Sequence, residues 1–165
     1  MIEFRRAAIP DEIDALCEFD RKVFHAYPSD VYGPEAWKEF ESHWLIVDGI
    51  IVGCTAFGHN VDYDYEARPG YLFISSTGVL PEFRRKGFGK EQKKWQIEYA
   101  KKNGFKIIVT NMRQSNEPII RLNEWFGFKQ RKVHLHYYHE PDEAAIVMEL
   151  DLGNLPTPCP RRVAV

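Results

Sequence analysis

Residues 77–128 of the chain read TGVLPEFRRKGFGKEQKKWQIEYAKKNGFKIIVTNMRQSNEPIIRLNEWFGF. An apolar run ends near Leu80, Pro81 interrupts it, and two glycines, Gly87 and Gly89, precede a long helical pattern. The start of a helix presents unpaired N–H groups and the positive end of its dipole, and glycine lets the backbone approach a ligand closely. Because four basic side chains accompany these groups, the segment predicts a binding site for a dianion such as pyrophosphate.

This segment resembles the GNAT-superfamily N-acetyltransferases, which bind the pyrophosphate of acetyl-CoA at a Gln/Arg-x-x-Gly-x-Gly/Ala loop. The matching loop is residues 84–89, and Asn116 and a Gly-Phe pair at 127–128 follow at the spacing of the family. The resemblance implies an α/β (α+β) fold with a GNAT-type central mixed, mostly antiparallel sheet and helices on both faces. It also implies an acetyl-CoA-dependent N-acetyltransferase that moves the acetyl group directly to a primary amine.

Three parts of the chain contact the cofactor in this resemblance: the end of a strand, the loop and the start of a later helix. Backbone N–H groups of residues 85–90 are expected to bind the pyrophosphate, and arginines beside them to add charge. Gly78 would leave room for the pantetheine arm or mark a β-bulge, and Asn116 would bind the arm or serve as a helix N-cap. The cofactor residues implied are Thr77, Gly78, Val79, Arg84, Arg85, Lys86, Gly87, Phe88, Gly89, Lys90, Asn116 and Asn123.

Asn123 is the position where the chain departs from the family pattern. Many family members have a tyrosine seven residues after the asparagine, and this tyrosine protonates the departing CoA thiolate. A carboxamide donates a hydrogen bond but does not give up a proton, so the acid role is either lost at Asn123 or taken by Tyr137 or Tyr138. A free thiol has a pKa near ~8.5, so protonation of the thiolate by water is a further route.

The attacking amine must be neutral, so a base or a bound water has to accept its proton. The predicted strand at 71–79 holds no carboxylate, although Ser75 and Ser76 could hold a water. The remaining candidates precede this strand, where a surface loop is the simpler explanation for each: they are His59, Asp62, Asp64 and Glu66. The sequence therefore names no base. By the resemblance, the sheet splits beside Val79, where a backbone N–H polarises the thioester oxygen.

Charge is unevenly distributed along the 165 residues, although the formal net charge is only −2. Residues 1–80 hold 6 Lys and Arg against 14 Asp and Glu, whereas residues 81–140 hold 14 against 6. The acidic part is either ordinary solvated surface or a vestibule for a cationic amine. We expect a small-molecule amine as the acceptor. The alternatives are a peptide or protein amine, and a catalytically silent CoA-binding protein.

Length and composition limit the possible domain number, cellular location and partners. The length predicts one domain at 1–152, followed by an irregular Pro- and Gly-rich tail at 153–165. The three widely spaced cysteines argue against a disulfide framework, and no apolar run resembles a signal peptide or membrane span. We therefore expect a cytoplasmic protein without membrane or nucleic-acid partners, and the resemblance allows a homodimer. Histidines at 134, 136 and 139 form one metal-like cluster, but further ligands are not evident and no metal is predicted.

Hydrophobic periodicity predicts the other elements. A two-residue turn at Asp48-Gly49 indicates a hairpin within 44–53. The helix at 87–103 is expected to bury one stripe and to expose its lysines on the other face; the stripe is Phe88, Gln92, Trp95 and Tyr99. The helix after Asn116 is expected to bury Ile119, Leu122 and Phe126. Further strands are expected at 2–8, 71–79, 105–110, 128–139 and 144–152, and further helices from Pro10 and at 35–42.

Overall fold

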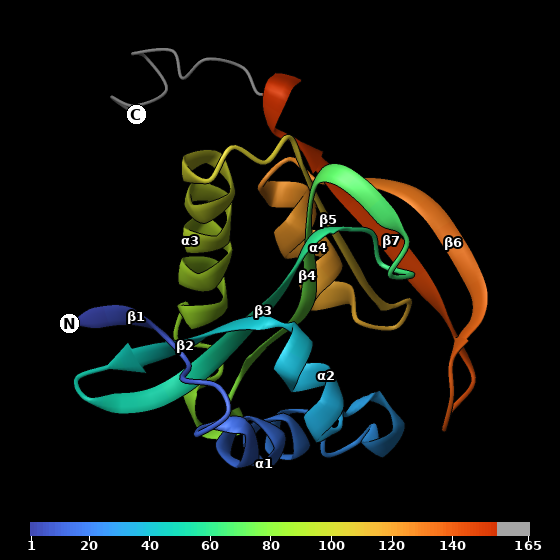
Figure 1. Ribbon diagram of the computed structural model, residues 1–165. Helices are drawn as coiled ribbons and strands as arrows, with labels where there is room; N and C mark the ends of the chain where they lie inside the picture. Colours follow the sequence, from blue (N-terminus) through green and yellow to red (C-terminus); the bar gives the residue numbers. More distant parts are fainter. Residues whose placement is uncertain (155–165) are drawn as a thin grey trace.

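The computed structural model describes residues 1–154, and the predicted tail from residue 155 onward lies outside the described residues. Figure 1 shows one sheet with helices on both sides. The elements in chain order are β1 (Ile2–Arg6), α1 (Ile13–Val23), α2 (Pro34–Glu39), β2 (Glu41–Val47), β3 (Ile50–Val61), β4 (Ala67–Val79), α3 (Phe88–Lys102), β5 (Ile107–Arg113), α4 (Glu117–Trp125), β6 (Lys129–Tyr138) and β7 (Glu143–Asp151). No helix among residues 1–154 is long and apolar enough to cross a membrane.

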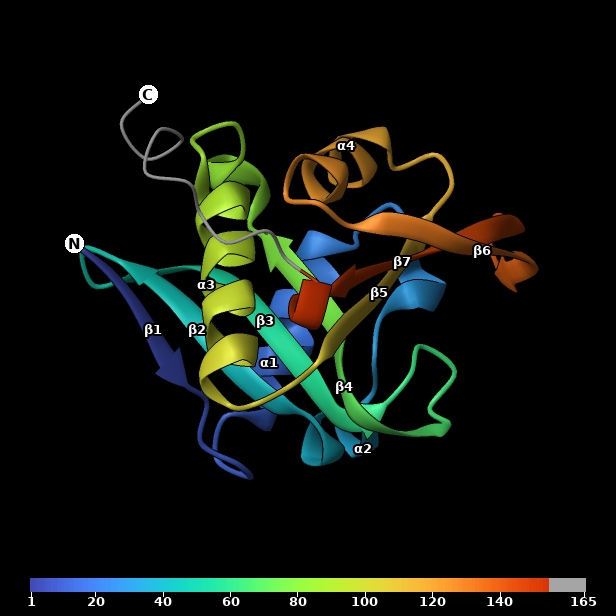
Figure 2. The same ribbon diagram turned by 90° about the horizontal axis from the view of Figure 1, so that it is seen from above.

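The seven strands form one sheet in the order β1-β2-β3-β4-β5-β7-β6. Every neighbouring pair is antiparallel except β4 and β5, which are parallel. Helices α1 and α2 cover one face of the sheet, and α3 and α4 cover the other (Figures 1 and 2). The predicted α/β fold with a mixed, mostly antiparallel sheet is therefore confirmed.

The predicted hairpin is the β2–β3 turn. Asp48 and Gly49 both have positive φ angles, 49° and 83°, as a tight two-residue turn requires. The next turn covers only residues 62–66, because β3 extends to Val61 and β4 begins at Ala67, four residues before the predicted strand at 71–79. The carboxylate of Asp62 organises this turn by accepting backbone N–H groups two and four residues later.

The buried face of α3 differs from the predicted stripe. Its fully buried residues are Gln92, Lys93, Gln96, Ile97 and Ala100, so one lysine of the supposedly exposed face points inward. The aromatic residues of the predicted stripe lie at the border of the core, where Trp95 stacks on Phe4 of β1. The prediction was right for Gln92 and wrong for Lys93, because the helix packs with a polar strip against the sheet, and hydrophobicity alone does not identify such a face.

The buried residue of α4 is Asn123, whereas the three predicted core residues are only half-buried. Asn116 stands at the N-cap position, but its side chain makes no capping hydrogen bond. Asn116 therefore occupies the predicted N-cap position without the capping hydrogen bond that the prediction requires, and its side-chain amide is exposed. This leaves the amide accessible to a ligand.

Candidate active site

The centre of the site is a fork between β4 and β5. The two parallel strands pair over only four residues, from Tyr71–Ile107 to Ile74–Thr110, and then part. Ser75 bulges out of β4, because Ala56 and Phe57 of β3 pair with Ser76 and Ile74. We call the opening beyond the Ile74–Thr110 pair the fork. It begins five residues before Val79, where the sequence analysis placed the split.

A β-bulge was one of the two roles considered for Gly78. Gly78 does not bulge, because it pairs regularly with Cys54. A Cβ on Gly78 would lie 2.6 Å from the Cγ1 of Val23 at the end of α1. The glycine is therefore required for helix packing, and the predicted β-bulge lies at Ser75 instead. Because Leu80 N–H bonds to Val52 of β3, strand alternation turns the N–H groups of Thr77 and Val79 toward the fork.

Two tyrosines from other elements hydrogen-bond to the two strands of the fork, on the side covered by α1 and α2. The Tyr32 hydroxyl donates to the carbonyl of Ser75 at 3.2 Å. The Tyr138 hydroxyl accepts from the Asn111 amide at 2.8 Å. Burial raises the pKa of both phenols far above neutral pH, so both stay protonated. Tyr138 therefore lies at the fork as a hydrogen-bonding group.

Tyr137, the other predicted acid, lies further from this position. Its hydroxyl donates to the backbone carbonyl of Tyr63 at 3.2 Å, in the turn between β3 and β4. Burial raises its pKa to about 12. The described contacts thus place Tyr137 in the packing between this turn and β6, and its catalytic role stays a prediction.

Asp20 is a buried acid beside the fork that the sequence analysis did not identify. Its side chain is 1% exposed, accepts the Tyr32 backbone N–H at 2.8 Å and is hydrogen-bonded by Ser76. Burial raises the pKa of this carboxyl to about 6, and no salt bridge neutralises it within residues 1–154. The sequence signal was an aspartate on the apolar stripe of α1, seven residues after Ile13.

A buried ion pair fastens the segments around this side of the fork. The Arg113 guanidinium binds Asp30 through two hydrogen bonds of 2.8 and 2.9 Å, and it also binds Glu143. It lies between the rings of Tyr27 and Tyr138, 4.3 and 4.7 Å from their centroids. We call these residues the arginine clamp. The clamp joins the α1–α2 segment to the β6–β7 turn and so closes one end of the site.

On the opposite face, the start of α3 carries the loop that the sequence predicts to bind an anion. Arg85 and Gly87 both have positive φ angles, 64° and 86°. Within the described chain, none of the N–H groups of residues 85–90 donates a hydrogen bond to another group. A Cβ on Gly87 would meet nothing within 4 Å, and one on Gly89 would meet only Leu122 at 4.0 Å. Unpaired donors facing open space fit a pyrophosphate.

The loop is held in place by two side chains that are not free to bind a ligand. Arg84 donates to the carbonyls of Val79 and Val23, at 3.1 and 3.0 Å. Gln92 donates to the carbonyls of Cys54 and Gly78, both at 3.2 Å. The basic side chains that remain available to attract the anion are therefore those of Arg85, Lys86 and Lys90, which are exposed.

Three buried polar atoms on α3 and α4 have no hydrogen-bond partner among residues 1–154: Lys93 Nζ, Gln96 Oε1 and Asn123 Oδ1. Gln96 donates its amide N–H to Thr77 Oγ1 on β4 at 3.1 Å, which places this group at the fork. Figure 2 shows the end of β4 between α3 and α4. Orphaned polar groups are rare in protein interiors. Their position between the anion loop and the fork fits the polar pantetheine arm of CoA.

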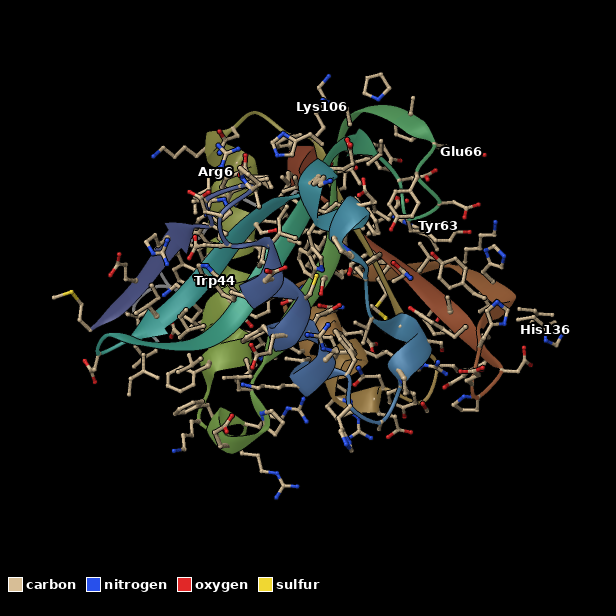
Figure 3. The ribbon with its side chains drawn as sticks, turned by 60° about the horizontal axis from the view of Figure 1, so that its bottom comes forward. Arg6, Trp44, Tyr63, Glu66, Lys106 and His136 are labelled. Carbon is tan, nitrogen blue, oxygen red and sulfur yellow. The ribbon has the colours of Figure 1, made fainter. Side chains whose placement is uncertain are left out.

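The other base candidates and the histidine cluster lie away from the fork. His59 lies 3.4 Å from the Tyr99 hydroxyl, and Tyr63 and Glu66 mark the outer β3–β4 turn in Figure 3. His134 bonds to the Tyr63 hydroxyl at 2.9 Å, whereas His136 projects at the edge and pairs with Asp142. The two histidines have different partners, and the β6–β7 register shifts after His134.

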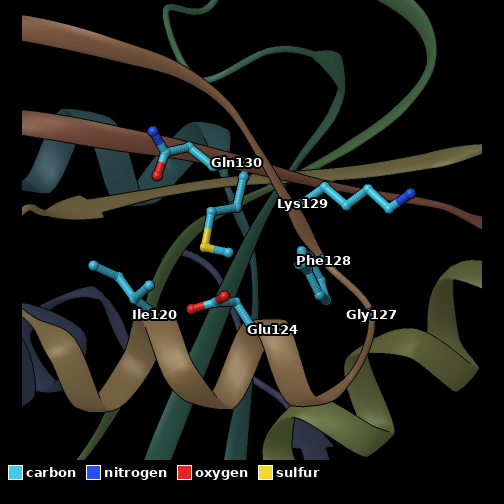
Figure 4. Close-up of a pocket in the computed structure, with 7 residues that line it drawn as sticks. Ile120, Glu124, Gly127, Phe128, Lys129 and Gln130 are labelled. Atoms are coloured by element: carbon cyan, nitrogen blue, oxygen red, sulfur yellow. The ribbon is translucent and has the colours of Figure 1, made fainter.

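A cavity of about 390 Å³ lies beyond α4 (Figure 4). Two of its walls are shared with the site, since Met148 contacts the Asn123 amide and Phe128 contacts Lys93. The other lining residues are Ile120, Glu124, Gly127, Lys129 and Gln130. The fork and the anion loop do not line this cavity.

Comparison with known proteins gives a consistent result. A model of the acetyltransferase (GNAT) family matches residues 11–128. An N-alpha-acetyltransferase of Sulfurisphaera tokodaii is 26% identical over 152 residues, 87% of this chain and 89% of the relative. An uncharacterised N-acetyltransferase of Methanocaldococcus jannaschii is 27% identical over 139 residues, and the match spans 78% of this chain but only 61% of the relative.

Solved structures share the fold at low sequence identity. The ribosomal-protein-S18-alanine N-acetyltransferase of Escherichia coli superposes with a TM-score of 0.76 at 18% identity, covering 95% of this chain and 100% of that one. A Bacillus subtilis acetyltransferase in complex with CoA gives a TM-score of 0.74 at 17% identity, covering 92% and 99%.

Proposed function

Because the chain belongs to the acetyltransferase (GNAT) family, we propose that it transfers the acetyl group of acetyl-CoA directly to a primary amine. The observation that supports this most is the row of unpaired N–H groups at residues 85–90, which leads to orphaned polar atoms beside the fork. Residues 85–90 bind the pyrophosphate, and Thr77 and Val79 offer backbone N–H groups along the fork. One of these N–H groups polarises the thioester carbonyl.

The acceptor binds on the α1–α2 side of the fork. There the Asp20 carboxylate supplies negative charge, no residue among 1–154 forms a salt bridge with it, and a cationic amine complements it. Asp20 is ionised above a pH of about 6, so at neutral pH it can accept the proton that the amine loses. Tyr32 and Tyr138 flank this position and orient the amine.

The acceptor is a small amine in this proposal. The arginine clamp joins the α1–α2 segment to the β6–β7 turn, and the Tyr32 and Tyr65 hydroxyls, 3.0 Å apart, join it to the β3–β4 turn. Three fastened segments leave little room for an extended chain. The second candidate is the α-amine of a peptide, favoured by the relative named as an N-alpha-acetyltransferase.

The test is release of free thiol from acetyl-CoA with a panel of small amines and of peptides with free N-termini. Turnover with small cationic amines and not with peptides supports the first candidate, and the reverse result supports the second. Binding of CoA without release with any amine would contradict the transferase proposal. It would leave a CoA-binding protein without catalytic activity.

A further inference from the structure

Of the three buried side chains with an unpaired polar atom between the anion loop and the fork, only Lys93 can act as an acid. Its side chain is 2% exposed, and its Nζ lies 5.0 Å from the centre of the Phe128 ring. The N–H of Phe128 in turn bonds to the carbonyl of Asn123 at 3.0 Å. Lys93 therefore extends from α3 toward the position on α4 where the resemblance places an acid and this chain has Asn123.

The same side chain lies close to the fork. Lys93 and Gln96 are three residues apart on α3, so they share one face of the helix. Gln96 reaches Thr77 on β4, whose backbone N–H faces the fork. Lys93 thus lies on the face of α3 that meets β4 through Gln96, and its Nζ lies beside Phe128, which follows α4.

A buried ammonium without a partner is unfavourable, because burial removes its hydration. No acidic or other hydrogen-bonding group within residues 1–154 binds the Lys93 Nζ. Burial accordingly lowers the pKa of Lys93 to about 7. An amine with such a pKa exists in both protonation states near neutral pH, and a general acid needs both. Packing alone does not explain a lysine here, since an apolar side chain of similar length would avoid this penalty.

We propose that Lys93 is the general acid of the reaction and protonates the sulfur of the departing CoA. The inference rests on the proposed N-acetyltransferase function. The amine nitrogen bonds to the carbonyl carbon, the carbon–sulfur bond breaks, and its electron pair moves to sulfur. A proton passes from Lys93 Nζ to that sulfur, giving the CoA thiol and a neutral lysine. The proton of the attacking amine passes to Asp20. After the products leave, Asp20 releases that proton to solvent and Lys93 regains one from solvent.

The direct test compares the binding of CoA with that of desulfo-CoA, which lacks only the sulfur. Calorimetry is carried out on the unchanged protein, on Lys93→Met and on the control Lys94→Met, which alters the exposed neighbouring lysine. The unchanged protein should prefer CoA roughly tenfold or more, the effect of one charge-assisted hydrogen bond. Lys93→Met should lose that preference and bind desulfo-CoA as before, whereas Lys94→Met should keep it.

Kinetics provides the second readout. Lys93→Met should lower kcat by roughly 10²-fold or more. In the unchanged protein kcat should fall above a pH of about 7, where Lys93 loses its proton, and the variant should lack this fall. Thermal melting checks the fold, and the variant should melt no lower than the unchanged protein because methionine removes a buried charge.

The outcomes separate the two proposals. A preference for CoA that persists in folded Lys93→Met overturns the role of Lys93 but leaves the transferase intact. If that variant does not fold, the unchanged protein still decides, since equal affinity for CoA and desulfo-CoA overturns the role. Failure of the unchanged protein to bind either compound overturns both proposals.

Discussion

At the scale of single residues, the site depends on polar side chains that are buried without full compensation. Asp20 and Lys93 lie on opposite sides of the sheet, and burial shifts their pKa values toward neutrality from below and from above. One group can accept a proton from the amine and the other can donate one to sulfur. Opposed shifts of this kind are a physical indication of acid and base roles.

Asp20→Asn tests the base at this scale. Asparagine can still accept the Tyr32 N–H, so the fold should persist, but kcat should fall roughly 10²–10⁴-fold. In the unchanged protein, kcat/KM should decline as the pH falls below about 6, where Asp20 becomes protonated. A pH–rate profile of both proteins checks this, and an unaltered acid limb in the variant would exclude Asp20 as the base.

The same variant should change the pH dependence of stability. The folded-state pKa of Asp20 lies above its unfolded value of 3.8, so the native state binds more protons between a pH of about 4 and about 6. Its burial therefore costs stability progressively as the pH rises through this window, by at most about 3 kcal/mol. Asp20→Asn should remove this loss, which denaturant titrations at pH 4 and pH 8 would measure. A loss that persists in the variant would mean that another group causes it.

At the scale of elements, the start of α3 and the clamp position the two substrates separately. The anion loop is tied to the end of β4 by Arg84 and by Gln92, so the N–H groups are presented by a fixed backbone. The acceptor side is ordered by Arg113, which joins segments far apart in the sequence. Changes in one element should therefore affect one substrate.

Gly89→Arg should weaken CoA binding strongly. A side chain at this position extends into the open space in front of the N–H groups, where the ligand belongs. Calorimetry should show at least a tenfold loss of affinity with little change in melting temperature. Gly33→Arg is a matched control, because a Cβ there also meets nothing within 4 Å but the residue precedes α2 instead of α3. Unchanged CoA affinity in Gly89→Arg would contradict the assignment of the loop.

Arg113→Met should disrupt the acceptor side alone. Removing one partner of a buried ion pair typically costs about 3–5 kcal/mol, and here it leaves Asp30 and Glu143 without their common cation. Chemical denaturation should show this loss. The KM for the amine should rise while the affinity for CoA stays the same. A loss of CoA affinity equal to the loss for the amine would show that the clamp also supports the cofactor site.

At the scale of the whole molecule, the sheet of residues 1–154 is joined across its centre by only four residue pairs, which connect β1–β4 to β5–β7. A ligand in the fork contacts both parts. CoA at about 100 times its Kd should therefore raise the free energy of unfolding by about 2.7 kcal/mol. Hydrogen exchange should slow at Thr77, Val79 and residues 85–90, and exchange that slows only around the cavity beyond α4 would place the ligand elsewhere.

Much of this architecture follows from patterns of neighbouring residues. Asp48-Gly49 specifies a hairpin because both residues accept positive φ, and Gly87 specifies the left-handed entry into α3 for the same reason. The left-handed turn before α3 and the helix itself could be predicted, since backbone conformation there depends on local sequence. The mixed sheet and acetyl-CoA followed from the family resemblance.

The chemistry beside the loop depends on contacts between distant parts of the chain. Asp20 is an ordinary helical aspartate until β4 and the Tyr32 segment bury it, and Lys93 is one of many lysines until α4 covers it. The position of the fork depends on a bulge at Ser75 that the pairing of three strands determines. Desolvation and strand pairing are properties of the assembled fold, so only the tertiary structure separates these residues from similar ones exposed to solvent.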